Sequence, residues 1–265
     1  PFIFQTGNEV FCKIHKEVRY TMMNIAVIFA GGVGSRMHSK ERPKQFLEMY
    51  NKPIIIHTLE HFQNHPLIDK IVVVCIESWI PYLNDLLYKF RIEKVEKVVP
   101  GGKTGQLSIY NGLNAAKELA KNEKAIVLIH DGVRPLITEK LITNNIESVK
   151  EYGSAITTAK VKETILVVNE KDSSIDYVPS RSNSRVAKAP QSFWLNDILA
   201  VHEKALAKEE YNWIDSCTMM QENGFKLHLI DGPSQNIKIT TPEDFYTMRA
   251  ILEAKENEQI YGFED

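Results

Sequence analysis

The sequence predicts an α/β fold with a mainly parallel β-sheet and helices on both faces. Short runs of β-branched and other apolar residues alternate with amphipathic stretches from about residue 24 onward, an order typical of strand–helix–strand units. A glycine-rich segment directly follows the first apolar run, at the strand end where such folds bind ligands. Because no repeat or low-complexity linker interrupts the 265 residues, we expect one domain over 24–256. Residues 1–23 are expected to be an extension or expression remnant, and 257–265 a tail.

The elements follow from the chain in order. The run Ile25–Phe29 predicts the first buried strand. Further strands are expected at 71–76, 95–99, 125–129, 155–159 and 226–230, and helices near 53–64, 79–90, 106–121 and 138–151. A last helix is expected from Thr241, because Pro242 suits a first helical position.

One stretch departs from this alternation. Residues 161–190 contain short apolar runs separated by polar turns, which predicts a β-arm that stands off the core. Long excursions of this kind in compact domains are often functional. A solvated hairpin without a function is the plainer alternative.

The composition excludes several classes of protein. Eight histidines aside, 32 basic and 34 acidic residues leave a formal net charge of −2, so no nucleic-acid partner is indicated. No apolar stretch reaches transmembrane length, and no signal-peptide pattern is present. Three scattered cysteines fit a reducing compartment, so we expect a cytoplasmic protein. His57, His61 and His65 recur at helical spacing, but Thr58 stands where a zincin motif requires glutamate.

A phosphate-binding loop is predicted directly after the first strand, where residues 30–45 read AGGVGSRMHSKERPKQ. Glycines let backbone N–H groups approach phosphate oxygens closely. Arg36 and Lys44 add fixed positive charge to this loop. The pattern therefore indicates a nucleoside triphosphate site.

The two commonest glycine-rich loops do not fit. A Walker loop ends in Gly-Lys-Ser/Thr, whereas Gly34 is followed by Ser35-Arg36. A dinucleotide loop requires a third glycine where this chain has Met37. What remains is a more specific pattern, Gly-Gly-x-Gly-x-Arg-Met followed by Pro-Lys-Gln.

Two other strand ends carry polar residues. Asp131 and Arg134 follow the 125–129 strand; Asp131 could hold Mg²⁺, position a hydroxyl or cap a turn, and Arg134 could hold phosphate or pair with an acid. Lys238 lies between two isoleucines, so its side chain points opposite to theirs, into the site or into solvent. A second glycine loop at 101–105 precedes a helix and could contact a base through its main chain.

At these residues the chain resembles the cytidylyltransferases that make CDP-methylerythritol and CDP-ribitol from CTP and a polyol phosphate. The resemblance runs from about Asn24 to Lys255. Its ordered anchors are Ala30–Met37, Pro43–Gln45, Gly101-Gly102 with Ser108, His130-Asp131 with Arg134-Pro135, Pro190–Phe193 and Asn236–Thr240.

The resemblance implies a Rossmann-like nucleotidyltransferase domain whose β-arm reaches across a homodimer, and it implies roles for particular residues. Cytosine and ribose would lie against nucleotide-binding residues, and Arg36 and Lys44 would hold the triphosphate with Mg²⁺. Asp131 would lie near the metal and the polyol, and Arg134 and Asp215 would bind the substrate. Thr164 and Arg181 of the partner's arm would hold the acceptor phosphate with Lys238. The nucleotide-binding residues would be Ala30, Gly31, Gly32, Gly34, Gly102 and Ser108.

Three positions depart from the family pattern. Gly105 stands where an arginine is usual, Ala189 replaces a threonine, and Ile214 replaces the threonine before Asp215. Ala30-Gly31-Gly32 is more similar to the ribitol group than to the methylerythritol group. We therefore expect D-ribitol 5-phosphate as the acceptor, with 2-C-methyl-D-erythritol 4-phosphate as the alternative.

The reaction expected is nucleotidyl transfer without a strong general base, because the second pKa of a phosphate monoester is about 6. Catalysis would depend on positioning and charge neutralisation. Two other classes of protein fit these residues less well. A non-catalytic nucleotide-binding protein would not need Lys44, Asp131 and Lys238 together, and a sugar-1-phosphate nucleotidyltransferase is disfavoured by Pro43–Gln45 and by the arm.

Overall fold

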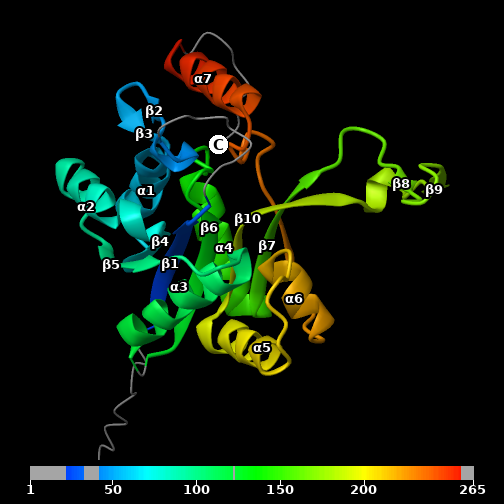
Figure 1. The fold of residues 1–265 in the computed structure, drawn as a ribbon, viewed down its shortest axis with the longest axis horizontal. Coiled ribbons are helices and arrows are strands. Elements are labelled where there is room, and N and C mark those ends of the chain that lie inside the picture. Colours follow the sequence, from blue (N-terminus) through cyan, green and yellow to red (C-terminus); the bar gives the residue numbers. More distant parts are fainter. Residues whose placement is uncertain (1–21, 33–41, 122, 258–265) are drawn as a thin grey trace, which may run out of the picture.

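The computed structural model describes residues 22–32, 42–121 and 123–257, which form a central seven-stranded sheet flanked by helices (Figure 1). Across the sheet the strand order is β11-β7-β10-β6-β1-β4-β5. All strands except β10 run in one direction, and β10 pairs antiparallel with both of its neighbours. The strands are β1 (Met23–Ala30), β4 (Lys70–Cys75), β5 (Val95–Pro100), β6 (Ala125–Asp131), β7 (Ser154–Lys160), β10 (Arg185–Trp194) and β11 (Leu229–Asp231).

Alternate side chains of the strands enter two apolar layers, one on each face of the sheet. Ala26 and Ile28 pack on the side of α1, α2 and α4, whereas Ile25 and Val27 pack on the side of α3, α5 and α6. The mainly parallel sheet with helices on both faces is therefore confirmed. The helices are α1 (Ile54–Asn64), α2 (Ile80–Lys89), α3 (Gly105–Ala120), α4 (Glu139–Tyr152), α5 (Leu195–Ala207), α6 (Ser216–Glu222) and α7 (Pro242–Asn257).

The helix α7 begins at Pro242, as the sequence predicts. Its first turn is held by Asp244, whose Oδ2 accepts hydrogen bonds from the N–H groups of Thr240 and Thr241, both at 2.8 Å. A side chain at the third helical position that accepts from the N–H of the residue before the helix stabilises the helix start. Met248 of α7 belongs to a third apolar cluster with Val133 and Leu136. This packing holds the segment before α7 over the carboxyl end of β6.

The antiparallel strand β10 was not predicted. Pro190 within it argues against a central strand, because proline cannot donate to a neighbouring strand. The structure accommodates Pro190 where the pairing of β10 with β7 shifts register, between Ala187 and Gln191. The helices α5 and α6 were not predicted either, and β11 begins at Leu229, later than the expected 226.

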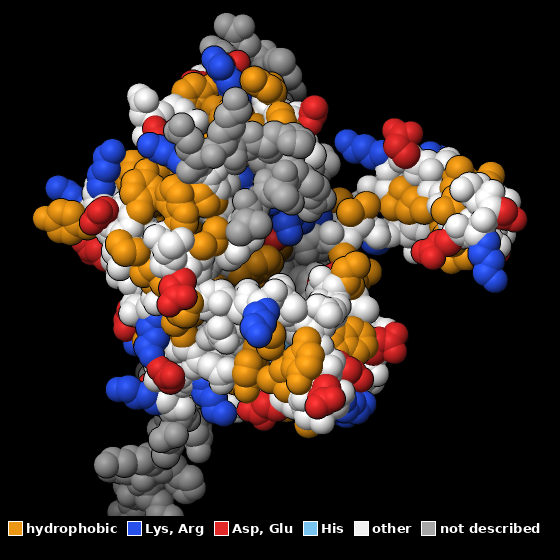
Figure 2. Space-filling model, in the orientation of Figure 1, with side chains coloured by type: hydrophobic (Ala, Val, Ile, Leu, Met, Phe, Trp, Pro, Cys, Tyr) orange, Lys and Arg blue, Asp and Glu red, His pale blue; other side chains and the backbone are white. Residues whose placement is uncertain are grey.

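Between β7 and β10 the chain forms a projecting arm, which Figures 1 and 2 show standing clear of the body. At its end two short strands, β8 (Val167–Val168) and β9 (Ile175–Tyr177), pair antiparallel, and a short 3₁₀ helix, Arg181–Asn183, follows. β10 starts at Arg185, within the stretch predicted as the arm; its first three residues are exposed, whereas Ala189 is already buried in the body. Among the described residues, none of the helices combines the length and hydropathy that a membrane crossing requires.

Two small elements complete the body. The hairpin of β2 (Glu48–Met49) and β3 (Lys52–Pro53) leads into α1. The 3₁₀ helices Lys44–Phe46 and Glu77–Trp79 are joined by stacking of Phe46 on Trp79, with ring centroids 4.9 Å apart.

Candidate active site

Two glycine loops meet at the carboxyl edge of the sheet. Gly31 follows β1 and Gly101 follows β5. A Cβ atom placed on Gly31 would lie 3.5 Å from Oγ of Ser108 and 3.7 Å from Cα of Gly101. The N–H of Gly101 donates to the carbonyl of Cys75 at 2.8 Å, which fixes the second loop to the end of β4. The main chains of both loops are therefore within contact distance of each other.

The second loop is held by the start of α3. The N–H of Gly102 donates to Oγ of Ser108 at 3.0 Å, and Ser108 donates to the carbonyl of Thr104 at 2.9 Å. The Thr104 side chain caps α3 by accepting from the N–H of Leu107. A Cβ on Gly102 would lie 2.5 Å from Cβ of Leu107, so the loop needs glycine there.

The Pro-Lys-Gln segment is tied to the first loop. Gln45, which is 1% exposed, donates from Nε2 to the carbonyl of Ala30 at 2.6 Å. Lys44 precedes it in the 3₁₀ helix and is half-buried. The bond between Gln45 and Ala30 therefore places Lys44 next to the end of β1. Gly32 lies in the described part of this loop, whereas Gly34 and Arg36 lie outside the described residues.

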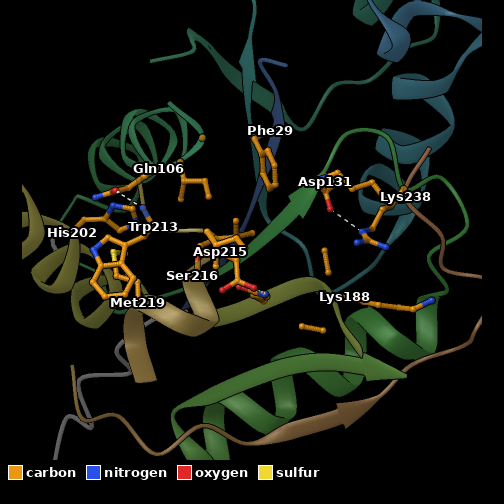
Figure 3. A pocket seen from close by; sticks show the side chains of 18 residues that line it. Phe29, Gln106, Asp131, Lys188, His202, Trp213, Asp215, Ser216, Met219 and Lys238 are labelled. Atoms are coloured by element: carbon orange, nitrogen blue, oxygen red, sulfur yellow. Dashed lines mark hydrogen bonds and ion pairs between the residues drawn. The ribbon is translucent and has the colours of Figure 1, made fainter. Parts of the chain in front are cut away.

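A buried carboxylate with two cations lies at the end of β6. Asp131 is 4% exposed, and its Oδ2 lies 2.7 Å from Nε of Arg134. Its Oδ1 lies 2.6 Å from Nζ of Lys238, an ion pair drawn as a dashed line in Figure 3. Lys238 is placed by Ile239, whose N–H donates to the carbonyl of Val133 at 2.9 Å.

The charge state of Asp131 follows from these contacts. Burial alone would raise the pKa of Asp131, but the positive charges of Lys238 and Arg134 outweigh it. The pKa therefore lies below its ordinary value, and the carboxylate is ionised at neutral pH. Arg134 pairs with this acid, which is one of the two sequence alternatives, and it also lines the pocket described next; phosphate binding by Arg134 stays a prediction.

The loop that carries Asp131 is held by buried polar groups. Thr58 of α1 donates to the carbonyl of Gly132 at 3.0 Å. Nε2 of His130 lies 3.1 Å from the carbonyl of Arg134, and complete burial lowers the pKa of His130 to about 3. Neutral His130 is thus part of the support beneath the charged residues.

A cavity of about 350 Å³ opens beside this cluster (Figure 3). At one end lie Asp131, Lys188 and Lys238, and at the other lie His202 and Trp213 (Figure 3). Phe29, at the end of β1, lines the space between them. The cavity is therefore basic at one end and aromatic at the other.

The aromatic end is uncharged. His202 of α5 is 1% exposed, and its ring stacks on Tyr110 with centroids 5.8 Å apart. Burial lowers the pKa of His202 to about 4, so the ring is neutral at pH 7. The backbone N–H of Trp213 donates to Oε1 of Gln106 at 3.1 Å, and its indole Nε1 donates to Oε2 of Glu210 at 3.2 Å, so the ring is fixed.

Asp215 lies between the two ends. Its Oδ1 accepts from the N–H of Thr218 at 2.8 Å and so caps α6. Its Oδ2 accepts from Nε2 of Gln191 at 3.3 Å. Ile214 beside it is 86% exposed, so the residue that replaces threonine makes little contact within the chain. Asp215 lines the cavity with its hydrogen-bonding capacity already partly used.

The predicted residues of the arm are not brought into this cavity within one chain. Thr164 and Arg181 are both exposed on the projecting arm, and Nη1 of Arg181 donates to the carbonyl of Lys162 at 3.3 Å. Neither residue lines the cavity that contains Asp131 and Lys238.

The donor set of the cavity fits a Mg²⁺ ion that arrives with a triphosphate. Protein sites hold Mg²⁺ through one or two carboxylates plus substrate phosphates. Asp131 supplies one carboxylate, and each of its oxygens, although paired with a cation, keeps a further lone pair. Among the described residues no cluster of three or more histidine, cysteine or acidic side chains could form a metal site by itself.

The three histidines at helical spacing, of which His57 and His61 lie in α1 and His65 follows it, instead bond to backbone carbonyls. His57 pairs with Met49, His61 with Pro135 and His65 with Glu139, at 3.0 to 3.2 Å. These contacts join α1 to its neighbours.

Sequence reasoning assigned no role to Lys188, Gln191, His202 or Trp213, all of which line the cavity. Lys188 lies in the stretch interpreted as an arm, and Gln191 lies in a strand that was not predicted. His202 and Trp213 lie in and beside helices that were also not predicted. An amphipathic pattern over 195–207 was the signal that could have placed His202.

Comparison with known proteins gives consistent results. The family profile described as "IspD: 2-C-methyl-D-erythritol 4-phosphate cytidylyltransferase" matches residues 24–254. The ribitol-5-phosphate cytidylyltransferase of Streptococcus agalactiae serotype V is 55% identical over 91% of this chain and 100% of that protein. The 2-C-methyl-D-erythritol 4-phosphate cytidylyltransferase of Clostridium botulinum strain Langeland is 42% identical over 87% of this chain and 97% of that protein.

A solved structure shows the same fold. The crystal structure of 4-diphosphocytidyl-2C-methyl-D-erythritol synthase from Anaerococcus prevotii superposes with a TM-score of 0.75 at 29% identity. The likeness covers 87% of this chain and 96% of that one.

Proposed function

The chain belongs to the IspD cytidylyltransferase family, and we propose that its acceptor is D-ribitol 5-phosphate, so that the products are CDP-ribitol and pyrophosphate. The enzyme is a CTP-dependent nucleotidyltransferase that acts on a polyol phosphate. The observation that carries the choice of acceptor is the higher identity, along the full length, to a protein named for ribitol 5-phosphate.

The reaction joins the acceptor's phosphate oxygen to the α-phosphorus of CTP. The bond from the α-phosphorus to the bridging oxygen breaks, and its electron pair leaves with pyrophosphate. Because a phosphate monoester is largely a dianion at neutral pH, no proton has to be removed before attack. The basic end of the cavity supplies what this reaction needs, namely fixed positive charge where two anions approach each other.

The residues divide between the two substrates. The converging loops of Gly31 and Gly102, with Ser108, offer main-chain and hydroxyl groups of the kind that recognise a base and ribose. Lys44 and Arg36 are assigned to the triphosphate. Lys238 and Arg134 are assigned to the acceptor side of Asp131.

Mg²⁺ is proposed as the cofactor, with Asp131 as one protein ligand. When bound, the ion would neutralise charge on the triphosphate. Asp131 also orients Lys238 and Arg134, which is a role that this chain performs by itself.

A homodimer is proposed, in which each arm completes the site of the partner subunit. The support is the position of Arg181 and Thr164, which are exposed on an arm that stands away from the body of their own chain (Figure 1). A cytoplasmic location is proposed from the cysteine usage and from the supply of CTP.

The test measures pyrophosphate release from CTP, UTP, ATP and GTP with each of the two acceptors. We expect CTP to be preferred, excess chelator to abolish turnover, and kcat/KM to be higher with D-ribitol 5-phosphate. A higher kcat/KM with 2-C-methyl-D-erythritol 4-phosphate would overturn the acceptor and leave the reaction class intact. Binding of CTP without turnover of any acceptor would favour a non-catalytic nucleotide-binding protein.

A further inference from the structure

Lys188 reaches the basic end of the cavity because β10 runs antiparallel. Its neighbours β6 and β7 end at the edge of the sheet where the glycine loops meet, whereas β10 starts there. Lys188 lies in the first half of β10 and lines the cavity on the side of Asp131 and Lys238 (Figure 3).

Backbone carbonyls hold the Lys188 ammonium. Its Nζ donates to the carbonyl of Ser234 at 2.9 Å and to the carbonyl of Asn236 at 3.2 Å. The Asn236 carbonyl also accepts from Nη1 of Arg134 at 3.0 Å. Asn236 is fully buried and its Nδ2 donates to the carbonyl of Ala189 at 2.7 Å, so this shared acceptor is fixed.

Three cations therefore lie in one connected network. Lys238 and Arg134 both contact Asp131, and Arg134 and Lys188 both contact the Asn236 carbonyl. Asp131 is the single carboxylate in this network, and within the described part of the chain no carboxylate lies within ion-pair distance of Lys188. A half-buried ammonium without a counter-charge is costly unless an anion completes the site. The excess of positive charge matches a phosphate dianion.

We propose that Lys188 is a further binding residue for the acceptor, and that its ammonium contacts the acceptor's phosphate next to Arg134 and Lys238. This inference rests on the proposed function and adds to it the residue that neutralises the attacking group. The glycine loops and Lys44 are assigned to CTP, so we expect the effect of Lys188 to be confined to the acceptor.

The proposed role of Lys188 predicts a pH dependence of kcat/KM for the acceptor. Burial lowers its pKa to about 8, and the positive charges of Arg134 and Lys162 lower it in the same direction. Lys238 and Asp131 are the other charged groups of the network to which Lys188 belongs. Because the lysine loses its charge as pH rises through about 8, the acceptor's kcat/KM should fall over that range.

The experiment compares full-length Lys188→Met and Lys188→Arg with the wild type and with a control, Lys204→Met, at an exposed position on α5. Initial rates are measured with CTP and D-ribitol 5-phosphate from pH 6 to pH 9.5. Because Lys188→Met removes a charge-assisted hydrogen bond, we expect it to raise the acceptor KM roughly 10- to 100-fold at pH 7. The KM for CTP should stay within about twofold of the wild-type value.

The pH profile separates a direct contact from a structural effect. In the wild type, kcat/KM for the acceptor should fall as pH rises above about 8. In Lys188→Arg this fall should be absent because arginine stays charged. In Lys188→Met it should be absent because there is no ammonium to titrate. The proposal would be overturned if Lys188→Met raised the KM for CTP or lowered kcat/KM equally for both substrates. It would also be overturned if Lys188→Met still showed the fall in kcat/KM near pH 8. Thermal unfolding of each variant tests whether the fold is retained. If Lys188→Met does not fold, the pH profile of Lys188→Arg decides, because a fall in its kcat/KM near pH 8 would overturn the proposal.

Failure of the proposed acceptor gives a different pattern. If the wild type uses only 2-C-methyl-D-erythritol 4-phosphate, the same KM comparison with that phosphate monoester still decides on Lys188. If no acceptor is used, calorimetry with inorganic phosphate decides, since equal binding by the wild type and Lys188→Met would refute the contact.

Discussion

Nζ of Lys238 lies 2.6 Å from Oδ1 of Asp131, although one residue precedes α7 and the other ends β6. The pair joins the last segment of the domain to the centre of its sheet. It also keeps a cation next to a carboxylate at the end of the cavity to which we assign the acceptor's phosphate. An incoming phosphate therefore meets a lysine that is already ordered, which reduces the entropy lost on binding.

Replacing Lys238 with methionine should lower kcat/KM roughly 10²- to 10³-fold, because one group that stabilises charge in the transition state is lost. The pKa of Asp131 should rise as well, since burial then meets one opposing cation fewer. Steady-state kinetics measure the first effect, with Lys204→Met as the matched control on an exposed face. Unchanged kcat/KM in a folded Lys238→Met protein would show that the ion pair is purely structural.

Lys44→Ala should remove most activity without unfolding the chain. Gln45 and Phe46 are buried and Gln45 bonds to the carbonyl of Ala30, so the 3₁₀ helix is held without the lysine side chain. We expect a decrease of roughly 10²- to 10³-fold in kcat. Turnover is measured alongside the circular dichroism spectrum, and near-normal turnover would make Lys44 an ordinary surface residue.

The fold was predictable where local pattern and tertiary structure agree. The parallel strands β1, β4 and β6 are continuous apolar runs because both of their faces are buried. The pattern failed for β10, where Lys188 and Pro190 interrupt the apolar run, since one lines the cavity and the other lies at a register shift. Those departures from strand-like sequence are where the strand contributes to the site.

From the sequence, site residues could be proposed only where they follow or flank a predicted strand, because the ends of parallel strands meet at one edge of the sheet. Asp131 and Lys238 could each be proposed from their positions, but the sequence left the direction of Lys238 open. The contact depends on α7 packing over Val133, a tertiary feature that no local pattern encodes. Thr164 and Arg181 came from family resemblance alone, and their part in the site stays a prediction.

Gly102→Ala should damage the nucleotide loop, whereas Gly105→Ala should not. A Cβ on Gly102 would lie 2.5 Å from Cβ of Leu107, while nothing lies within 4 Å of a Cβ on Gly105. Gly105 begins α3, where alanine favours the helix by up to about 1 kcal/mol. We expect Gly102→Ala to raise the KM for CTP and lower the melting temperature, and Gly105→Ala to keep both near the wild-type values. Equal behaviour of the two variants in kinetics and thermal unfolding would contradict this account of the loop.

The free energy of unfolding should decrease as pH falls from 7 to 5. Burial lowers the pKa of His130 to about 3 and of His202 to about 4, whereas an unfolded histidine titrates near 6.5. Between these values the unfolded chain binds more protons, so stability present above pH 6.5 is lost on acidification, by about 1.4 kcal/mol per pH unit for each histidine. Urea unfolding at both pH values measures the slope, and His202→Phe should reduce it. A wild-type unfolding free energy that does not change between pH 7 and 5 would show that these rings are protonated in the fold.

Two inactive variants should restore activity to each other if the arm completes the partner's site. Arg181 lies on the projecting arm, and Lys44 lies in the body beside β1 (Figure 1). In a mixed dimer of Arg181→Ala and Lys44→Ala subunits, one of the two sites receives Lys44 from one chain and Arg181 from the other. Equal co-expression should therefore recover about a quarter of the wild-type activity in a symmetric dimer.

The matched control combines Lys44→Ala with Lys238→Met. Both residues belong to the body of one chain, so every site in that mixed dimer lacks one of them and no activity should return. Light scattering establishes whether the dimers form. Full activity in a monomer, or no recovery in mixed dimers of Arg181→Ala and Lys44→Ala, would mean that Arg181 acts within its own chain or not at all. Recovery confined to the pair that separates arm from body would show that the acceptor's phosphate is bound between two subunits, since only then can intact groups from different chains meet in one site.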